Sequence, residues 1–286
     1  MIAVTGSTGQ LGGLVLEHLL AMTDAKFLIG LARSPHKAEH FAKQGVTMRS
    51  FDFNKVDALP TSLQGVETLL LISGTEIGPR VQQHKNVIDA AVKAGVKRIV
   101  YTSVVIADIG KEPIYNDHKL TEDYIQQSGL QATILRDNFY MEPYLVEVTI
   151  ASEKGVYRTA VTPTGGAALV SRNDVARTAA AVLLDEKHTG KTYNLTGPSV
   201  VTPQDFANLA AEISGKDVSY QQISYEELEQ DYKERGLAGE HMPFLILLEK
   251  TIASGELANV TEDIRTITGT EVESFADFVN KNHNQK

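Results

Sequence analysis

The N-terminal stretch that decides the fold is MIAVTGSTGQLGGLVLEHLL, residues 1–20. An apolar run over residues 1–4 is followed by glycines at positions 6, 9 and 12, and then by an apolar segment with helical spacing. This order predicts a buried strand, a tight glycine turn and a helix. Gly6 would permit the sharp turn, Gly9 the close approach of a pyrophosphate, and Gly12 the close packing of the helix on the strand.

The glycine turn therefore predicts a dinucleotide-binding site, because the first backbone N–H groups of a helix attract phosphate. A glycine-rich turn without a ligand is the alternative, but a strand before it and a helix after it favour the dinucleotide. The residues expected at the pyrophosphate are Gly6, Thr8, Gly9, Gln10, Leu11 and Gly12.

Short apolar runs alternate with longer helical patterns in the first half of the 286-residue chain. The runs are nearly all apolar, as expected for parallel strands that helices cover on both faces. The pattern predicts an α/β fold with a Rossmann-type doubly wound parallel sheet. The predicted strands are Ile2–Thr5, Phe27–Leu31, Thr47–Phe51, Thr68–Ile72, Arg98–Thr102 and Ala132–Leu135, with Thr192–Leu195 as a returning strand.

A smaller α+β region follows the sixth predicted strand. We expect a helix over Phe139–Ser152, strands over Gly155–Thr159 and Ala167–Val170, and a later helix with Thr202 as its N-cap. The sequence thus predicts an NAD(P)-binding domain over residues 1–155, with the sheet return near 167–196, and an interleaved smaller region over 156–286. This region is expected to line a substrate cleft.

The ends of the second and third predicted strands bear on the choice of dinucleotide. An NAD site usually carries a carboxylate at the end of the second strand, where this chain has Arg33. A guanidinium pairs well with a 2′-phosphate, which favours NADPH over NADH; a solvated Arg33 is the alternative. Asp52 and Phe53 would lie near the adenine, unless they only end the third strand.

Composition excludes several kinds of chemistry. The chain has no cysteine, which rules out disulfides, thiol nucleophiles and iron–sulfur clusters. Its net charge of -9 argues against a nucleic-acid partner, and no apolar run approaches the about 20 residues of a membrane span. His36 and His40 lack an evident third ligand, so no metal site is predicted. We expect a cytoplasmic protein with no membrane partner.

Four segments together carry a family resemblance: TGSTGQLG, QHKNVIDAAVKAGVKRIVYTS, HKLTEDYIQQSG and TILRDNFYMEPY. They resemble the NmrA-like atypical short-chain dehydrogenases/reductases, and within that group the bacterial quinone oxidoreductases. The resemblance covers essentially the whole chain. It implies a Rossmann domain, NADPH as the cofactor, and reduction of quinone-like acceptors without a flavin. The group also includes proteins that bind the dinucleotide and catalyse nothing.

A literal match to the catalytic residues of short-chain dehydrogenases is present. Those enzymes use a Ser, a Tyr and a Lys, and the Lys lowers the pKa of the Tyr from about 10. Ser103, Tyr115 and Lys119 match that order, with Asn116 as the expected N-cap of a helix that begins at the next residue.

The NmrA-like pattern usually lacks the Tyr–Lys pair and places His118 where the lysine would stand. His118 would then contact the nicotinamide ribose or relay a proton. Alternatively, it is a surface residue paired with Glu122 one helical turn later.

Further site residues follow from the rule that ligands bind at the carboxyl ends of the strands in this architecture. The residues expected at the cofactor after the fourth and fifth strands are Ile72, Ser73, Gly74, Thr102 and Ser103. An aromatic segment after the sixth strand would stack on a flat acceptor or anchor the second region. It comprises Asn138, Phe139, Tyr140 and Tyr144.

Three functions remain open at this point. The first is an NADPH-dependent reductase of quinones or similar small molecules, in which catalysis is mainly the positioning of two flat rings. The second is a non-catalytic NADP(H)-sensing regulator that binds a protein partner. The third, a nucleotide-sugar epimerase or dehydratase, requires a working Tyr115–Lys119 pair. A homodimer is a candidate assembly.

Overall fold

The computed structural model describes residues 1–110, 112–237, 239 and 242–283. The chain divides into two compact, interleaved units. Unit 1 comprises Met1–Asp137, Arg172–Leu195 and Asp263–Thr270, and unit 2 comprises Asn138–Ser171, Thr196–Glu262 and Glu271–Lys286. The first break thus follows Asp137, whereas the sequence pattern places the end of the first domain at residue 155.

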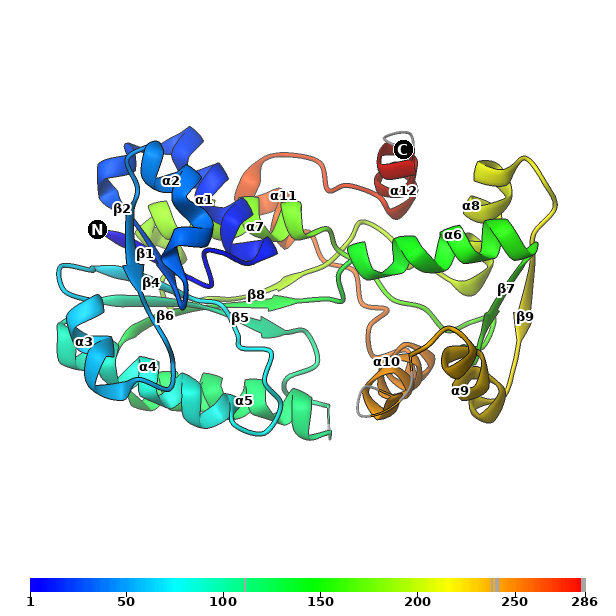
Figure 1. Cartoon of the computed structure of the whole chain (residues 1–286), viewed down its shortest axis with the longest axis horizontal. Helices are drawn as coiled ribbons and strands as arrows, with labels where there is room; N and C mark the ends of the chain where they lie inside the picture. The colour runs from blue at the N-terminus through cyan, green and yellow to red at the C-terminus, as the bar shows by residue number, and fades with distance from the viewer. Residues whose placement is uncertain (111, 238, 240–241, 284–286) are drawn as a thin grey trace. The chain divides into compact units, whose positions relative to one another are not determined.

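The described part of unit 1 is built around a seven-stranded sheet in the order β3-β2-β1-β4-β5-β6-β8 (Figure 1). The strands are β1 (Ile2–Thr5), β2 (Leu28–Ala32), β3 (Thr47–Ser50), β4 (Thr68–Leu71), β5 (Arg98–Val104), β6 (Gln131–Asp137) and β8 (Thr192–Leu195). All neighbouring strands run parallel. The order reverses between β1 and β4, which is the doubly wound arrangement, so the predicted fold class is confirmed.

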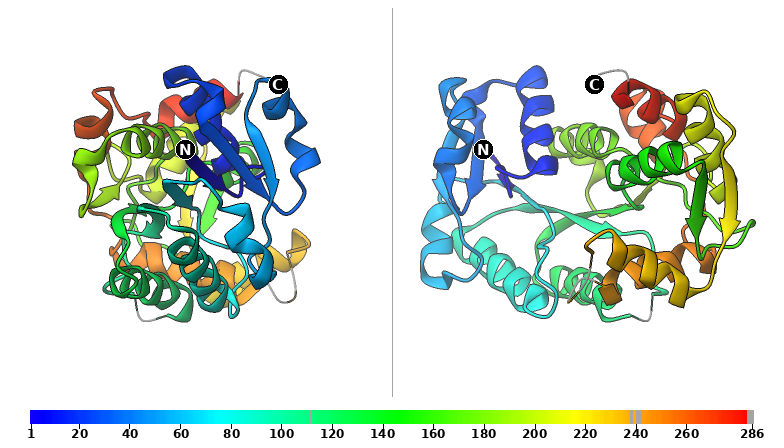
Figure 2. Two further views of the ribbon diagram at one scale, coloured as in Figure 1. Left: turned by 90° about the vertical axis from the view of Figure 1, so that its left-hand side faces the viewer. Right: turned by 45° about the vertical axis from the view of Figure 1, so that its right-hand side comes forward.

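Helices cover both faces of this sheet (Figures 1 and 2). Helix α7 packs between α1 and α11 on one face, and α4 packs between α3 and α5 on the other. The helices are α1 (Gln10–Met22), α2 (Glu39–Lys43), α3 (Leu59–Ser62), α4 (Arg80–Ala94), α5 (Pro113–Gln127), α7 (Arg172–Leu184) and α11 (Asp263–Thr268). The 3₁₀ turns are η1 (Ala25–Phe27), η2 (Pro35–Ala38), η3 (Val56–Ala58) and η5 (Glu186–His188).

Burial on both faces explains the apolar strands, and one buried cation ties a helix to them. Every residue of β5 is buried, including Arg98 at its start. The Arg98 guanidinium donates to the main-chain oxygens of Val182 and Leu183 at 3.0 and 2.6 Å. These carbonyls lie at the negative C-terminal end of α7. Arg98 thus fastens α7 to the sheet with a favourable charge interaction.

Unit 2 is a smaller α+β assembly. Strands β7 (Val156–Thr159) and β9 (Ser219–Gln222) pair in parallel. The helices are η4 (Glu142–Tyr144), α6 (Leu145–Lys154), α8 (Pro203–Ser214), α9 (Tyr225–Glu234), α10 (Met242–Ser254) and α12 (Phe275–His283). Helix α8 packs on α6, α12 and both strands, while α9 packs on α10. Thr202 caps α8 as predicted, and Asp205 completes a capping box by accepting from the Thr202 amide at 2.7 Å.

Three local predictions are wrong. Asn116 lies within the first turn of α5, because the helix begins at Pro113, a residue well suited to a first helical position. Ala167–Val170 forms isolated bridges instead of a strand. The helix expected from Phe139 starts at Glu142, because the backbone before it is held in extended pairing: the Val170 amide donates to the Phe139 carbonyl at 3.0 Å.

Candidate functional site

The glycine turn joins β1 to α1 in a tightly packed loop. Gly6 has a φ of +61°, a left-handed conformation that favours glycine, and its carbonyl accepts from the Gly9 amide at 2.8 Å. A Cβ at Gly12 would overlap the Gly6 carbonyl oxygen and lie 2.7 Å from the carbonyl carbon. The amide and hydroxyl of Ser7 both donate to the Leu31 carbonyl, at 3.2 and 3.1 Å, which fastens the turn to β2.

The N-terminus of α1 has the properties of a phosphate-binding site. The helix has 13 residues, starts at Gln10 after the N-cap Gly9, and carries no acidic residue in its first turn. Thr8 and Gln10 are exposed, whereas Leu11 is buried in the core. The first amides of a helix have no partner within the helix, and its dipole is positive at this end. The predicted pyrophosphate residues are therefore brought together in a geometry that suits an anion.

Arg33 lies just after β2, and its side chain is 74% exposed. Its Nη1 is 3.5 Å from Oε1 of Glu76, a residue of the loop after β4. The Nε2 of Gln83 in turn donates to Oε2 of Glu76 at 2.8 Å. Strands β2 and β4 flank β1, so the loops that follow these two strands begin on either side of the glycine turn. Sequence reasoning missed Glu76, since no local motif links it to Arg33.

Asp52 and Phe53 shape the loop that follows β3. The Asp52 Oδ1 accepts from the Asn54 amide at 3.0 Å, which is the geometry of an Asx turn. The Phe53 ring meets the rings of Phe51 and His84 edge-on, with centroids 5.8 and 6.3 Å apart. Both predicted residues are partly buried, and their contact with an adenine stays a prediction.

Side chains bind the backbone across the carboxyl ends of β1, β4 and β5. The Thr5 hydroxyl accepts from the Ile72 amide at 2.8 Å, and the Thr102 hydroxyl accepts from the Ser73 amide at 2.9 Å. The structure therefore brings the predicted residues Ile72, Ser73 and Thr102 together at one edge of the sheet. It also uses their amides and hydroxyls to fix the chain path after β4.

Gly74 is held at both of its backbone polar groups. Its amide donates to His84 Nε2 at 2.9 Å, and its carbonyl accepts from Arg80 Nε at 2.7 Å. The tautomer of His84 follows from Thr121, whose hydroxyl donates to the Asp117 carbonyl at 2.8 Å and so accepts from His84 Nδ1 at 3.0 Å. Two side chains of α4 thus set the position of the loop after β4.

Ser103 is oriented by a buried acid. Its hydroxyl donates to Glu122 Oε1 at 2.5 Å. Arg136 binds the same carboxylate in bidentate fashion at 3.0 and 2.6 Å, and it also binds Asp108, whose pKa this guanidinium holds below its usual range. An ionised carboxylate can only accept, so the hydroxyl hydrogen of Ser103 is committed to Glu122. Ser103 is left with its acceptor lone pairs.

His118 bridges Tyr101 and Arg80 within unit 1. Its Nδ1 lies 3.0 Å from the Tyr101 hydroxyl, and its Nε2 lies 3.5 Å from Arg80 Nη1. A guanidinium only donates, so Nε2 accepts and Nδ1 carries the hydrogen. The alternative of a surface pair with Glu122 is wrong, because Glu122 is engaged by the arginine and serine described above.

Burial keeps both histidines neutral. The pKa of His84 and that of His118 are each lowered to about 3, mainly because burial disfavours the imidazolium, with a further contribution from the charge of Arg80. Burial also lowers the pKa of Arg80 and raises that of Tyr101. At neutral pH, both imidazoles therefore act as fixed hydrogen-bond partners.

Tyr115 and Lys119 lie one turn apart on α5. Tyr115 is buried and packs against Gly110, where an added Cβ would lie 2.7 Å from the tyrosine Cβ. The Lys119 ammonium binds Asp123, and this hydrogen bond raises the pKa of Lys119. The catalytic role of Tyr115 and Lys119 stays a prediction.

The predicted acceptor residues belong to unit 2. Asn138 is buried, where its Nδ2 donates to the Leu257 carbonyl at 3.0 Å and its Oδ1 accepts from the Phe139 amide at 2.7 Å. Phe139 and Tyr140 are partly buried. Asn138 therefore sets the backbone that carries the two rings, and their contact with an acceptor stays a prediction.

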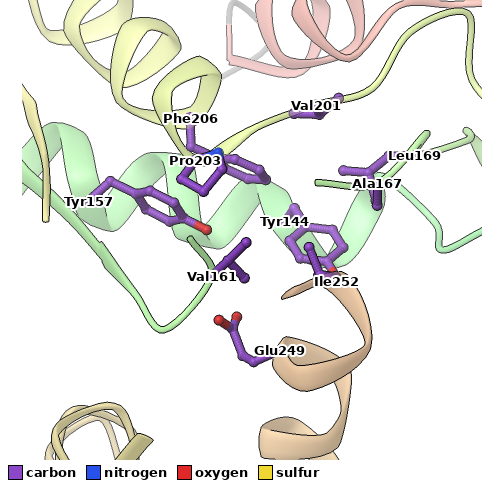
Figure 3. A pocket seen from close by; sticks show the side chains of 10 residues that line it. All are labelled: Tyr144, Tyr157, Val161, Ala167, Leu169, Val201, Pro203, Phe206, Glu249 and Ile252. Carbon is purple, nitrogen blue, oxygen red and sulfur yellow. The ribbon is translucent and has the colours of Figure 1, made fainter. Parts of the chain in front are cut away.

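Tyr144 lines a cavity inside unit 2 (Figure 3). The cavity has a volume of about 20 Å³, enough for about one water molecule. The rings of Tyr157 and Phe206 stack with centroids 4.8 Å apart, and Tyr144 meets Phe206 at 5.8 Å. The lining residues are Tyr144, Tyr157, Val161, Ala167, Leu169, Val201, Pro203, Phe206, Glu249 and Ile252. Tyr144 thus belongs to the aromatic core of unit 2.

Glu249 of α10 directs its carboxylate into this cavity (Figure 3). The side chain is buried; the Thr159 hydroxyl donates to one oxygen, and the Tyr232 hydroxyl donates to the other at 3.4 Å. Burial raises the pKa of Glu249, and the hydroxyl donors act in the opposite direction. Sequence reasoning missed this residue, although one acid in the apolar run MPFLILLEKTIAS is a usable signal.

Three other polar residues were not predicted from the sequence, and only one of them, Arg136, carried a signal there. Arg136 interrupts an apolar strand and lies in register with Ser103, so its charge was a signal. Arg80 and His84 were not distinguishable from solvated residues of α4, because their partners come from other elements.

Metal clusters and membrane spans are both missing from the part of the chain that the structure describes. Among those residues, no group of three or more His, Cys, Asp or Glu side chains is placed to hold a metal ion. His36 and His40 fall on separate short elements, η2 and α2. Across the same described ranges, no helix combines the length and apolar character needed to cross a membrane.

The strand order and the glycine turn at the start of α1 define an α/β protein of the Rossmann type. The chain belongs to the NmrA-like family, whose model matches residues 1–254. The resemblance stated from the sequence segments is therefore confirmed.

Relatives of known activity align over nearly the whole chain. The chain is 38% identical over 279 residues to Quinone oxidoreductase 2 of Escherichia coli K12, covering 98% of this chain and 97% of that protein. The NADPH complex of an E. coli NADPH-dependent quinone oxidoreductase aligns with a TM-score of 0.93 at 38% identity, covering 98% and 99% of the two chains. Citrobacter sp. triphenylmethane reductase complexed with NADP(H) aligns with a TM-score of 0.94 at 34% identity, with the same coverages.

Proposed function

We propose that the protein is an NADPH-dependent reductase that transfers hydride to quinones or to similarly flat, electron-poor acceptors. The observation that carries this proposal is the glycine turn at the N-terminus of α1, with Arg33 instead of a carboxylate after β2. The 38% identity to a quinone oxidoreductase, and the similarity to two structures complexed with NADPH or NADP(H), support it.

The residues of unit 1 fit NADPH. A Cβ at Gly9 would lie 3.2 Å from the Gly6 carbonyl oxygen, a tight contact with the turn that glycine avoids. The turn from Gly6 to Gly12 would hold the pyrophosphate, and Arg33 the 2′-phosphate. Asp52 and Phe53 would border the adenine. When bound, NADPH supplies the hydride from its nicotinamide ring.

The nicotinamide end is assigned to the strand ends beyond the switch point between β1 and β4. Residues 72–74 with Thr102 and Ser103 would border it. The Ser103 oxygen would accept a hydrogen bond from an N–H group, since its own hydrogen is committed to Glu122. His118 is neutral, so we assign it to the positioning of neighbouring groups and not to proton donation. A quinone takes its proton from water, so orientation is the main requirement.

In unit 2, Phe139 and Tyr140 are the proposed contacts of the acceptor ring, because aromatic side chains stack on flat molecules. Tyr144 is assigned a supporting role, as its ring packs against Phe206. No flavin and no metal are part of this proposal.

The test is quinone-dependent oxidation of NADPH and of NADH by the purified protein, followed by absorbance. Arg33→Ala should lower the preference for NADPH about tenfold, the value expected for losing one charge-assisted hydrogen bond. Lys97→Ala is the matched control, because Lys97 is 73% exposed and pairs with Glu67 at the N-terminal ends of the strands.

The results separate the parts of the proposal. Oxidation above the uncatalysed rate, with an NADPH preference that only Arg33→Ala reduces, would support it. Saturable NADPH binding without oxidation across several quinones would refute the reductase and favour a dinucleotide-sensing regulator. A preference for NADH in the unaltered protein would refute the role of Arg33.

A further inference from the structure

The loop after β4 places an acid at the position proposed for the 2′-phosphate. Oε1 of Glu76 lies 3.5 Å from Nη1 of Arg33, the guanidinium assigned to that phosphate. The acid expected in an NAD site, at the end of β2, is replaced here by Arg33. The structure therefore puts a carboxylate beside Arg33 from the loop after β4, where no sequence motif would reveal it.

The Glu76 carboxylate is held in this place by a second residue. Gln83 is 4% exposed on α4, and its Nε2 donates to Oε2 of Glu76 at 2.8 Å and to Asn54 Oδ1 at 3.3 Å. Because Gln83 anchors one oxygen, the other is directed at Arg33. The Glu76 carboxylate therefore has one partner on each oxygen, while its side chain is 48% exposed.

We propose that Glu76 limits the preference of this site for NADP(H) over NAD(H) by competing with the 2′-phosphate for Arg33; this rests on the proposed function. A 2′-phosphate must displace the carboxylate from the guanidinium and then lie beside a like charge. The 2′-hydroxyl of NAD(H) is neutral and can donate to the same carboxylate. Glu76 therefore weakens NADP(H) binding and does not weaken NAD(H) binding.

The expected effect is moderate, because both groups are solvated. Exposed charge pairs are screened, so removing this carboxylate should change affinity about two- to fivefold. The effect should shrink as salt is raised, because the Debye length falls from about 10 Å at 0.1 M to about 3 Å at 1 M.

The test measures binding without turnover. Calorimetric titrations with NADP⁺, NAD⁺, 2′,5′-ADP and 5′-AMP would compare the unaltered protein with Glu76→Gln, which keeps the shape of the side chain and removes its charge. Glu67→Gln is the matched control: it makes the same charge change just before β4, at the other end of that strand, where Glu67 binds the N-terminus and Lys97.

Glu76→Gln should bind NADP⁺ and 2′,5′-ADP about two- to fivefold more tightly, with NAD⁺ and 5′-AMP unchanged or weaker. Glu67→Gln should change none of them. The gain should also disappear in an Arg33→Ala background, because the competition acts through that guanidinium.

Unchanged or weaker NADP⁺ binding by Glu76→Gln would overturn the inference, and so would an equal gain in the Arg33→Ala background. A gain for all four ligands alike would overturn it as well. If the unaltered protein bound neither NADP⁺ nor NAD⁺, the proposed function itself would fail, which is a distinguishable result.

Discussion

Replacing Gly12 with alanine tests the central element of the fold and of the site in one experiment. The added Cβ would overlap the Gly6 carbonyl oxygen, and it would lie 2.7 Å from the Gly6 carbon and 3.0 Å from the Ser7 Cα. All three are backbone atoms, so no rotamer change can relieve the contact. The turn between β1 and α1 must move.

The expected cost follows from two terms. Overpacking against a well-packed site costs about 1–3 kcal/mol. Displacing the Gly6 carbonyl also weakens its 2.8 Å hydrogen bond with the Gly9 amide, which adds about 1 kcal/mol. Gly12→Ala should therefore lower the free energy of unfolding by about 2–4 kcal/mol. The moved amides should also weaken NADP⁺ binding by about tenfold or more.

Gly13→Ala is the matched control at the next position. There, the nearest atom to an added Cβ is the Ser7 carbonyl oxygen at 4.0 Å, which is ordinary contact. Because Gly13 lies inside α1, alanine should stabilise the protein by about 0.5–1 kcal/mol. The two neighbouring glycines should thus respond to the same change with opposite signs.

The assay is urea unfolding followed by circular dichroism, with a calorimetric titration of NADP⁺ on each folded variant. Equal stability of the two variants, or unchanged NADP⁺ affinity in Gly12→Ala, would refute the reasoning. Equal stability would mean that the helix is not packed on the turn as the structure has it, and unchanged affinity would mean that the amides of the turn do not hold the pyrophosphate.

Further predictions concern buried or partly buried titratable groups, and each is checked by urea unfolding. The pKa of His118 is about 3 in the folded protein against 6.5 for an unperturbed histidine, so the unfolded chain binds more protons between these values and stability falls as pH falls. Between pH 7 and pH 5, His118→Asn should lose about 2 kcal/mol less free energy of unfolding than the unaltered protein. An equal loss in both proteins would contradict the burial of a neutral imidazole. Arg136→Leu leaves the buried Glu122 without its bidentate partner and should cost about 3–5 kcal/mol. The double replacement of Glu122 and Arg136 by leucine should cost less than the two single changes together, whereas additive costs would rule out their coupling. The raised pKa of Glu249 means that its contribution to stability is present at acid pH and is lost as pH rises past 4.5 toward the folded pKa. The free energy of unfolding of Glu249→Gln, relative to that of the unaltered protein, should therefore be higher at pH 8 than at pH 4.5. The reverse order would argue against a raised pKa.

Local backbone requirements are the part of this protein that its sequence predicts well. The glycines of the first turn, the apolar strands and the Thr202 cap are each defined by residues within a few positions of one another. The doubly wound sheet follows from the order of such segments, because parallel strands need crossover helices of one hand. At Phe139, extended pairing with the distant Val170 overrode the local helix propensity. At Ala167–Val170, the expected strand is reduced to isolated bridges at its two ends.

Site residues divide in the same way. Residue type and position after a strand were enough to predict that Gly6, Arg33 and Ser103 lie at the carboxyl edge of the sheet. Their partners were not predictable, since Glu76 and Glu122 approach from other strands and helices. Surface and buried polar residues also look alike in a sequence.

By itself, then, the sequence determined the glycine turn, the alternation of strands and helices, and the absence of an acid after the second strand. Only the tertiary structure decided which side chains meet: Glu76 with Arg33, His118 with Tyr101, and Glu122 with Ser103. The physical reason is that a turn or a helix depends on neighbouring backbone geometry, whereas a charge or hydrogen bond depends on distance in space. In a parallel sheet, that distance is set by strand order, which brings together loops far apart in the chain.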